Sequence, residues 1–159
     1  TVTVIEEFMQ RAPLFEFASA REARDFSNWL DQSHANICQQ AETTTSIGKL
    51  QHIQKWVIAN KLYTRFNYTT GDAAGQNMTG KATHKACQWI LENYPGTIEN
   101  FSLSSGIETD KKHSHMNLLH SRGKKVVAEA TISKDVLKEL MRADPERMFR
   151  VYVYRHRPR

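Results

Sequence analysis

The stretch TTGDAAGQNM, residues 69–78, gathers small residues where a strand-like run passes into a helical one. Asp72 can cap a helix that begins near Ala73 by accepting hydrogen bonds from unpaired amides. Ala74 and Gly75 then leave the first helical turn with little side-chain bulk. Such a helix N-terminus combines free N–H groups with a partial positive charge, and therefore suits a phosphate or pyrophosphate. Close packing of the helix on a sheet also selects Gly and Ala, so the residues alone leave both interpretations open.

A second segment that could do chemistry is TDKK, residues 109–112. A lysine fixed in a dry site can stabilise negative charge that grows on a carbonyl oxygen. A solvated basic loop is the ordinary alternative, and the residues by themselves favour it. His113, His115 and His120 follow with a spacing that suits zinc, but no fourth ligand is evident. We therefore predict no metal site.

These segments must be positioned by strands and helices, which hydrophobic periodicity locates. Ser19 is a typical N-cap, with Glu22 three residues on as in a capping box. A hairpin precedes the helix of the small-residue turn, and the spacing is not GxGxxG, which disfavours a Rossmann fold. The order β-α-β-β-α-β predicts an α+β fold, a ferredoxin-like antiparallel sheet with helices on one face. The predicted elements are a strand at 14–17, a helix from 20 to about 43 with a break near Ser33, strands at 48–61 and 61–71, a helix from 73 to about 94, and a strand at 97–105.

The last third of the chain departs from that unit. Residues 116–123 and 124–133 look extended, and Ser133 can cap a short helix at 134–143. Residues 148–155 alternate like a final strand. The prediction is a C-terminal strand-helix-strand extension of the sheet unit.

Composition limits the function classes. The chain has 159 residues, 40% apolar and 25% charged, which describes a soluble globular protein. No apolar run is long enough for a membrane span, and the N-terminus has no signal-peptide pattern. Cys38 and Cys87 belong to no CxxC pair, which favours reduced thiols and a cytoplasmic location. The net charge of +5 favours a polyanionic partner such as nucleic acid, NADP or coenzyme A. The aromatic motif of RNA-binding ferredoxin-like modules is absent, so we predict no nucleic-acid partner.

Four segments in order resemble the small, NADPH-binding domain of class I 3-hydroxy-3-methylglutaryl-coenzyme A (HMG-CoA) reductase: QRAP at 10–13, RFNYTTGDAAGQNM at 65–78, TDKK at 109–112 and RGKKVVAEATI at 122–132. The resemblance runs from about Thr3 to Arg147. It implies that the small-residue turn lies against the NADPH phosphates. It also divides the compact unit into a nucleotide-binding domain, 1–110, and a lysine loop with C-terminal extension, 111–159.

The resemblance also implies roles for individual residues. Lys111 matches the catalytic lysine, which stabilises the oxyanion on a thioester or aldehyde oxygen, and Asp110 is implied to act beside it. The acyl group and its carboxylate would be held by Arg11, Ser104 and Lys112. The dinucleotide would be held by Asp72, Ala74, Gly75, Gln76, Asn77, Thr45 and Ser46.

Ser46 departs from the family, which places an arginine there to meet the 2′-phosphate of NADPH. Losing that charge-assisted contact weakens NADP(H) binding by about 1.5–3 kcal/mol, with Lys49 as a partial substitute. The glutamate, aspartate and histidine that complete catalysis in the family belong to a large domain outside residues 1–159.

Two functions follow. The first is an HMG-CoA reductase-like small domain that binds NADP(H) and part of an acyl-CoA, incompetent for reduction alone, and paired with a large-domain partner chain. The alternative is a stand-alone, repurposed protein that catalyses a cofactor-free isomerisation or cyclisation of a carbonyl substrate in natural-product biosynthesis. Apolar surface left uncovered without the large domain predicts a homo-oligomer in either case.

Overall fold

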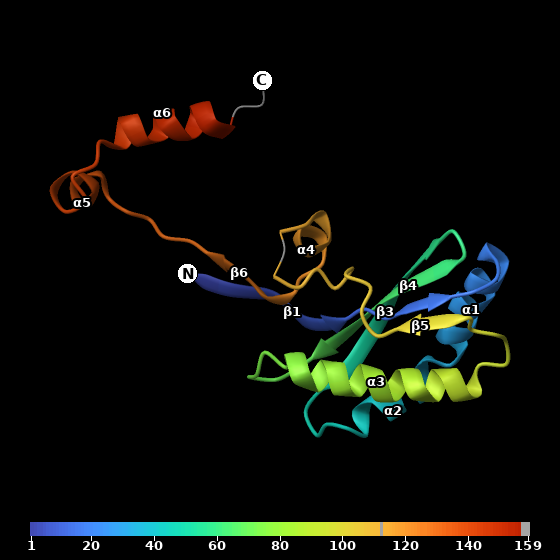
Figure 1. The fold of residues 1–159 in the computed structure, drawn as a ribbon. Helices are drawn as coiled ribbons and strands as arrows, with labels where there is room; N and C mark the ends of the chain where they lie inside the picture. The colour runs from blue at the N-terminus through green and yellow to red at the C-terminus, as the bar shows by residue number, and fades with distance from the viewer. Residues whose placement is uncertain (112, 157–159) are drawn as a thin grey trace. The chain divides into compact units, whose positions relative to one another are not determined.

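The computed structural model describes residues 1–111 and 113–156, with side chains up to residue 153 (Figure 1). Contacts divide the chain into two units, one of Val4–Val126 and one of Thr1–Thr3 with the chain from Val127 onward. We describe each unit by itself. The functional boundary at residue 110, which the resemblance implies, stays a prediction.

The first unit is built on a six-stranded antiparallel sheet, which confirms the α+β class. The strands run in the order β5-β2-β4-β1-β6, and β3 pairs with the other edge of β4. Because β2, β3, β4 and β5 are paired in the order β5-β2-β4-β3, they form the predicted ferredoxin-like core. The strands are β1 (Val2–Arg11), β2 (Leu14–Glu16), β3 (Lys49–Ile58), β4 (Lys61–Thr69), β5 (Asn100–Ser102) and β6 (Gly123–Ala128).

Strands β1 and β2 lie end to end along β4. Arg11 is opposite Phe66 and Leu14 is opposite Tyr63, so the register continues unbroken across Ala12 and Pro13. Pro13 has no N–H for the ladder, but its carbonyl accepts a bond from Thr64 N at 3.0 Å. The sequence pattern did not reveal β1, which therefore adds a strand that was not predicted.

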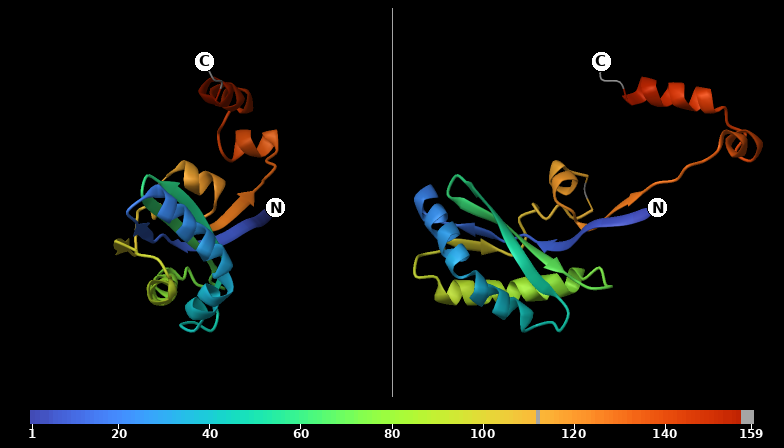
Figure 2. Two further views of the ribbon diagram at one scale, coloured as in Figure 1. Left: turned by 90° about the vertical axis from the view of Figure 1, so that its right-hand side faces the viewer. Right: turned by 180° about the vertical axis from the view of Figure 1, so that it is seen from behind.

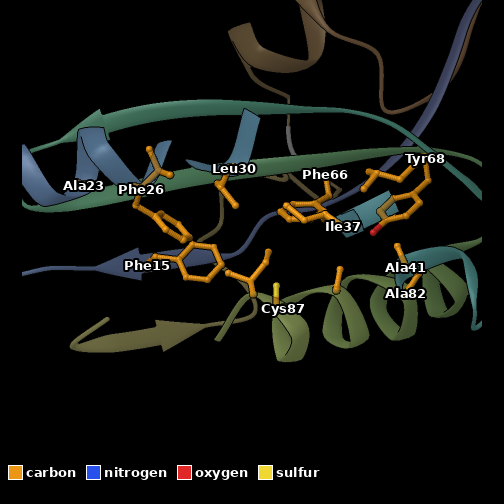
Figure 3. Close-up of a cluster of buried hydrophobic side chains, with 14 of the residues drawn as sticks. Phe15, Ala23, Phe26, Leu30, Ile37, Ala41, Phe66, Tyr68, Ala82 and Cys87 are labelled. Carbon is orange, nitrogen blue, oxygen red and sulfur yellow. The ribbon is translucent and has the colours of Figure 1, made fainter. Parts of the chain in front are cut away.

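Three helices cover one face of the sheet: α1 (Ala20–Gln32), α2 (His34–Glu42) and α3 (Gln76–Asn93), with α3 alongside α2 (Figure 2). Ser19 caps α1 by accepting a bond from Glu22 N at 3.3 Å, and Ser33 separates α1 from α2, both as predicted. In Figure 3 the rings of Phe15 and Phe26 lie next to each other, tilted, above α3. The buried cluster contains Phe15, Phe17, Ala23, Phe26, Leu30, Ile37, Ala41, Leu50, Leu62, Phe66, Tyr68, Ala82, Ala86, Cys87 and Ile90.

The prediction of an extended run at 116–123 was wrong for its first part. Residues His115–Leu119 form the short helix α4. Ser114 caps it by accepting a bond from Asn117 N at 3.1 Å. This local cap outweighs the strand-like run of apolar residues that follows it.

In the second unit, α5 (Lys134–Glu139) begins after its predicted cap Ser133, and α6 (Pro145–His156) follows. The final strand predicted at 148–155 was therefore wrong. Asp144, Pro145 and Glu146 form a helix start signal, and Glu146 N donates to Asp144 Oδ1 at 3.0 Å. This signal outweighs the alternation of the residues after it. Over the described residues, no helix is both long and apolar enough to cross a bilayer.

Candidate functional site

The small-residue turn ends at an uncapped helix. Helix α3 begins at Gln76, and its N-cap is Gly75 in the left-handed conformation, with φ of 72°. Asp72 therefore does not cap the helix, and the predicted start at Ala73 was wrong. A Cβ at position 75 would lie 2.4 Å from Thr70 Cγ2, so backbone conformation and packing both require glycine there. Among the described residues, no side chain caps the first amides of α3, which leaves them available to an anion.

A cavity of about 270 Å³ adjoins this turn. Thr70, Asp72, Ala73 and Ala74 line one side of it, and residues 7–9 of β1 with 123–124 of β6 line the other. Lys124 places a cation at the rim, where it pairs with Glu7. The turn thus has open space beside it, and neighbouring side chains do not fill that space.

Residues 109–111, called the lysine loop from here on, are bonded through Asp110 to the start of α3. Gln76 Nε2 donates to Asp110 Oδ2 at 2.7 Å, and Arg122 Nη2 lies 3.2 Å from Asp110 Oδ1. Thr109 and Lys111, on either side of Asp110, have φ of 53° and 56°. The left-handed region is uncommon for residues with a side chain, and it persists where the surroundings fix it.

A second cavity, of about 420 Å³, lies beside the lysine loop and is shallow and largely open to solvent. Lys111 lines it together with His113, Asn117 and Arg122. Its remaining lining residues are Met9 and Gly123, which also line the first cavity. The two cavities are therefore neighbours across these two residues, one beside the uncapped helix and one beside the lysine.

The sequence model of the family "Hydroxymethylglutaryl-coenzyme A reductase" matches residues 1–156. This chain belongs to the HMG-CoA reductase family. It is 36% identical over 143 residues to the 3-hydroxy-3-methylglutaryl-coenzyme A reductase of Aeropyrum pernix, covering 90% of this chain and 34% of that protein. The Methanocaldococcus jannaschii reductase is 39% identical over 145 residues, 88% of this chain and 36% of its own length. The Pyrococcus abyssi reductase is 32% identical over 155 residues, which cover 97% of this chain and 38% of that protein. The chain spans about a third of the length of these relatives.

The donors at the turn suit the phosphates of the dinucleotide that the HMG-CoA reductase family implies. The uncapped amides of α3 provide hydrogen-bond donors beside the first cavity. Lys124 lines that cavity, but its charge is paired with that of Glu7, which lines the same cavity. The turn offers fewer charged partners to a 2′-phosphate. Ser46 is exposed and has no charge to offer, and Lys49 Nζ is already paired with Glu42 at 2.7 Å.

Other residues that the family resemblance selected line neither cavity. Thr45 Oγ1 accepts bonds from Ile47 N and Gly48 N and contacts Met78 Sδ at 3.2 Å, so it fixes the loop against α3. Ser104 donates to Glu108. Arg11 lies against Gly80 of α3, and its buried Nε has no partner among the described atoms. Lys112 lies outside the described residues. Gln76 contacts Asp110, whereas Asn77 lies exposed in the first turn of α3.

Sequence reasoning gave no role to several residues that line the cavities, among them Glu7, Phe8, Met9, Asn117, Arg122 and Lys124. It also missed Arg65 behind them, which is fully buried in β4. Burial, and next the charge of Arg122, lower the pKa of Arg65 to about 10, so it stays charged at neutral pH. An available signal was the alternation in β4 of apolar residues with Arg65 and Asn67, which marks a second packed face.

Proposed function

We propose that this chain is the part of an HMG-CoA reductase that binds NADP(H) and the acyl group of an acyl-CoA substrate. The observation that carries the proposal is the pair of cavities that share Met9 and Gly123. Transfer between two bound molecules needs their reacting atoms about 3–3.5 Å apart, so their sites must adjoin. One cavity lies beside the uncapped start of α3 and the other beside Lys111, which supports a phosphate-bearing donor and a carbonyl acceptor.

The roles of the residues follow from their surroundings. When bound, the nicotinamide cofactor supplies a hydride. The first amides of α3 and Lys124 would hold its phosphates, with Asp72, Ala74 and Gly75 forming the close wall. The Lys111 ammonium would face the acyl oxygen and stabilise the charge that grows on it. Asp110 orients the loop through its bonds to Gln76 and Arg122.

The 159 residues by themselves are expected to bind these molecules without reducing the thioester. The relatives extend over about three times the matched length, and catalytic groups outside that match would complete the reaction. A partner chain or segment that supplies them is part of the proposal. Mixing the chain with NADPH and HMG-CoA should give no NADPH oxidation at 340 nm, while both ligands bind.

Fluorescence titration with NADPH tests the dinucleotide site. The Ser46→Arg variant tests the contact with the 2′-phosphate. The added guanidinium should tighten NADPH binding about 10–100-fold, because a charge-assisted contact contributes about 1.5–3 kcal/mol. NADH lacks the 2′-phosphate and should bind both proteins alike. Gln88→Arg adds the same charge to an exposed position of α3 and serves as control. If neither the chain nor Ser46→Arg binds NADPH or NADH, the dinucleotide function is wrong.

Self-association is a further part of the proposal. The unit from Val127 onward exposes Leu140 at 77% and Phe149 at 68% of their surface. Apolar side chains that exposed are commonly covered by a partner. Light scattering should give a mass above the monomer's 18.3 kDa, and Phe149→Glu should lower it. A monomeric wild-type chain at high concentration would rule out self-association through these residues.

A further inference from the structure

The side chain of Asn117 in α4 clamps the residue at the start of the lysine loop. Its Nδ2 donates to Thr109 O at 3.1 Å, and its Oδ1 accepts from Thr109 Oγ1 at 2.5 Å. One amide therefore holds both the main chain and the side chain of Thr109. A side chain bonded in two directions to one residue fixes the orientation of that residue as well as its distance.

The clamped backbone is the unfavourable part of the loop. Thr109 and Lys111 both have positive φ, and such residues persist only where neighbouring structure over-determines them. The neighbours that could do so are the Asn117 amide on Thr109 and the pair Gln76 and Arg122 on Asp110. Release of Thr109 would allow the loop to relax to ordinary dihedral angles and would redirect Lys111.

Asn117 is itself anchored to the central strand of the sheet. Arg65 Nη2 donates to Asn117 Oδ1 at 3.3 Å, and Arg65 is fully buried in β4. Arg65 Nη1 reaches Gln54 Oε1 on β3 at 3.5 Å, while its buried Nε has no partner among the described atoms. The contacts thus form a continuous path from the sheet through Arg65 and Asn117 to the lysine loop.

We propose that Asn117 is a positioning residue that sets the direction of Lys111 toward the acyl group, with Arg65 as its anchor. This inference rests on the proposed function, because it gives Lys111 the acyl group as its target. Asn117 lines the same cavity as Lys111, so removal of the Asn117 side chain changes both the lining of the cavity and the direction of Lys111.

The test compares Asn117→Ala and Asn117→Asp with Lys111→Ala in the full chain. Calorimetry measures affinity for HMG-CoA and for free coenzyme A, which lacks the acyl group. Acetic anhydride labelling with mass spectrometry measures the reactivity of Lys111 against Lys49 and Lys61, which lie elsewhere in the unit. Asn93→Ala removes a comparable side-chain-to-backbone bond, to Trp89 O, from an exposed position and serves as control.

Asn117→Ala should weaken HMG-CoA binding about tenfold, because small misplacements of a positioned group cost affinity and rate steeply. Free coenzyme A and NADPH should bind within about twofold of wild type, since their contacts lie elsewhere. Labelling of Lys111 should change while Lys49 and Lys61 keep their rates. Asn117→Asp keeps the oxygen that faces Arg65 and Thr109 and should recover part of the affinity.

The measurements distinguish failure of the positioning role of Asn117 from failure of the proposed acyl site. If Lys111→Ala weakens HMG-CoA binding and neither Asn117 variant does, the positioning role is wrong and the proposed function stands. If Lys111→Ala has no effect and HMG-CoA does not protect Lys111 from labelling, the acyl site itself is wrong. Should Asn117→Ala unfold, all lysines would label faster, and Asn117→Asp then decides: unchanged affinity and unchanged Lys111 labelling would overturn the inference.

Discussion

The two faces of the central sheet are packed in opposite ways. On one face, Leu62, Phe66 and Tyr68 of β4 lie in the apolar cluster under α1, α2 and α3. On the other, Arg65 and Asn67 of the same strand are equally buried, at 0% and 1% exposure. Adjacent residues of a strand point to opposite faces, so one nine-residue strand serves both.

The polar face is connected by hydrogen bonds instead of by contact area. Gln10 Nε2 donates to Asn67 Oδ1 at 3.0 Å and to Ser121 O at 2.6 Å. Glu6 accepts bonds from Ser121 Oγ and N, which lower the pKa of the Glu6 carboxyl. Apolar burial is non-directional and gives stability, whereas hydrogen bonds fix direction. The first face therefore supports the fold, and under the proposed function the second orients Lys111.

The largest effect is expected on the apolar face. Phe66→Ala should destabilise the protein by about 3–5 kcal/mol, because it removes a fully buried ring and leaves a cavity. Urea denaturation followed by circular dichroism measures the loss. Ile47→Ala, which truncates an exposed side chain of the same unit, should stay within about 0.5 kcal/mol of wild type. Similar losses for the two would contradict the assignment of the core.

The polar face should separate stability from function. Arg65→Met removes a buried charge, which relieves desolvation, but takes one of two donors from each of the oxygens of Gln54 and Asn117. The net loss should be about 1–3 kcal/mol, less than for Phe66→Ala. HMG-CoA affinity, measured in the same samples, should still fall.

Arg24→Met removes an arginine from an exposed pair with Asp25 and is the matched control. It should change neither stability nor affinity measurably, since exposed ion pairs contribute little. An Arg65→Met protein that keeps full HMG-CoA affinity would show that the polar face does not orient the site.

The sequence predicted the apolar face better than the polar one. Helical spacing of Ala23, Phe26 and Leu30, the cap at Ser19 and the hairpin before the small-residue turn were sufficient for the ferredoxin-like core. They are local signals, and apolar periodicity repeats along the chain. Strand β1 and helix α6 were missed because β-like alternation and capping signals compete over short segments, and tertiary pairing decides between them.

The candidate site was predicted only where motifs are contiguous. The turn at 70–75 and the loop at 109–111 line or adjoin cavities, and both segments were selected as candidates from sequence. Asn117, Arg65 and Met9 are far apart in the chain. They are brought together by the pairing of β1 with β4 and by the hydrogen bond from Arg65 to Asn117 of α4. No spacing rule links residues that distant, so their part in the site follows only from the fold.

Alkaline pH should lower the stability of the protein through two ionisable groups buried on the apolar face. Burial raises the pKa of the Cys87 thiol and of the Tyr68 hydroxyl above their ordinary values of 9.0 and 10.0. Below about pH 9 both folded and unfolded states keep the thiol proton. Above it the unfolded thiol ionises first, so the native state loses up to about 1.4 kcal/mol of stability per pH unit for each such group.

Urea midpoints between about pH 7 and pH 10 measure this slope. Cys87→Ala should flatten it. Cys38→Ala should flatten it less, because Cys38 is only partly buried and burial raises its pKa less strongly. A slope that is unchanged in Cys87→Ala would assign the alkaline loss to groups outside the core.

The smallest effect compares one substitution on the two faces. Ser19 caps α1, which packs on the apolar face, and Ser114 caps α4, whose Asn117 reaches the polar face. Ser19→Ala should cost about 1 kcal/mol of stability and leave HMG-CoA affinity unchanged. Ser114→Ala should cost less stability, because α4 has five residues and none of them is buried, but it should weaken HMG-CoA binding by loosening Asn117. The same lost cap would then appear in denaturation for one face and in ligand binding for the other. Equal effects of the two substitutions on both measurements would mean that α4 is held by its own packing, and that the polar face does not depend on its cap to aim the lysine loop.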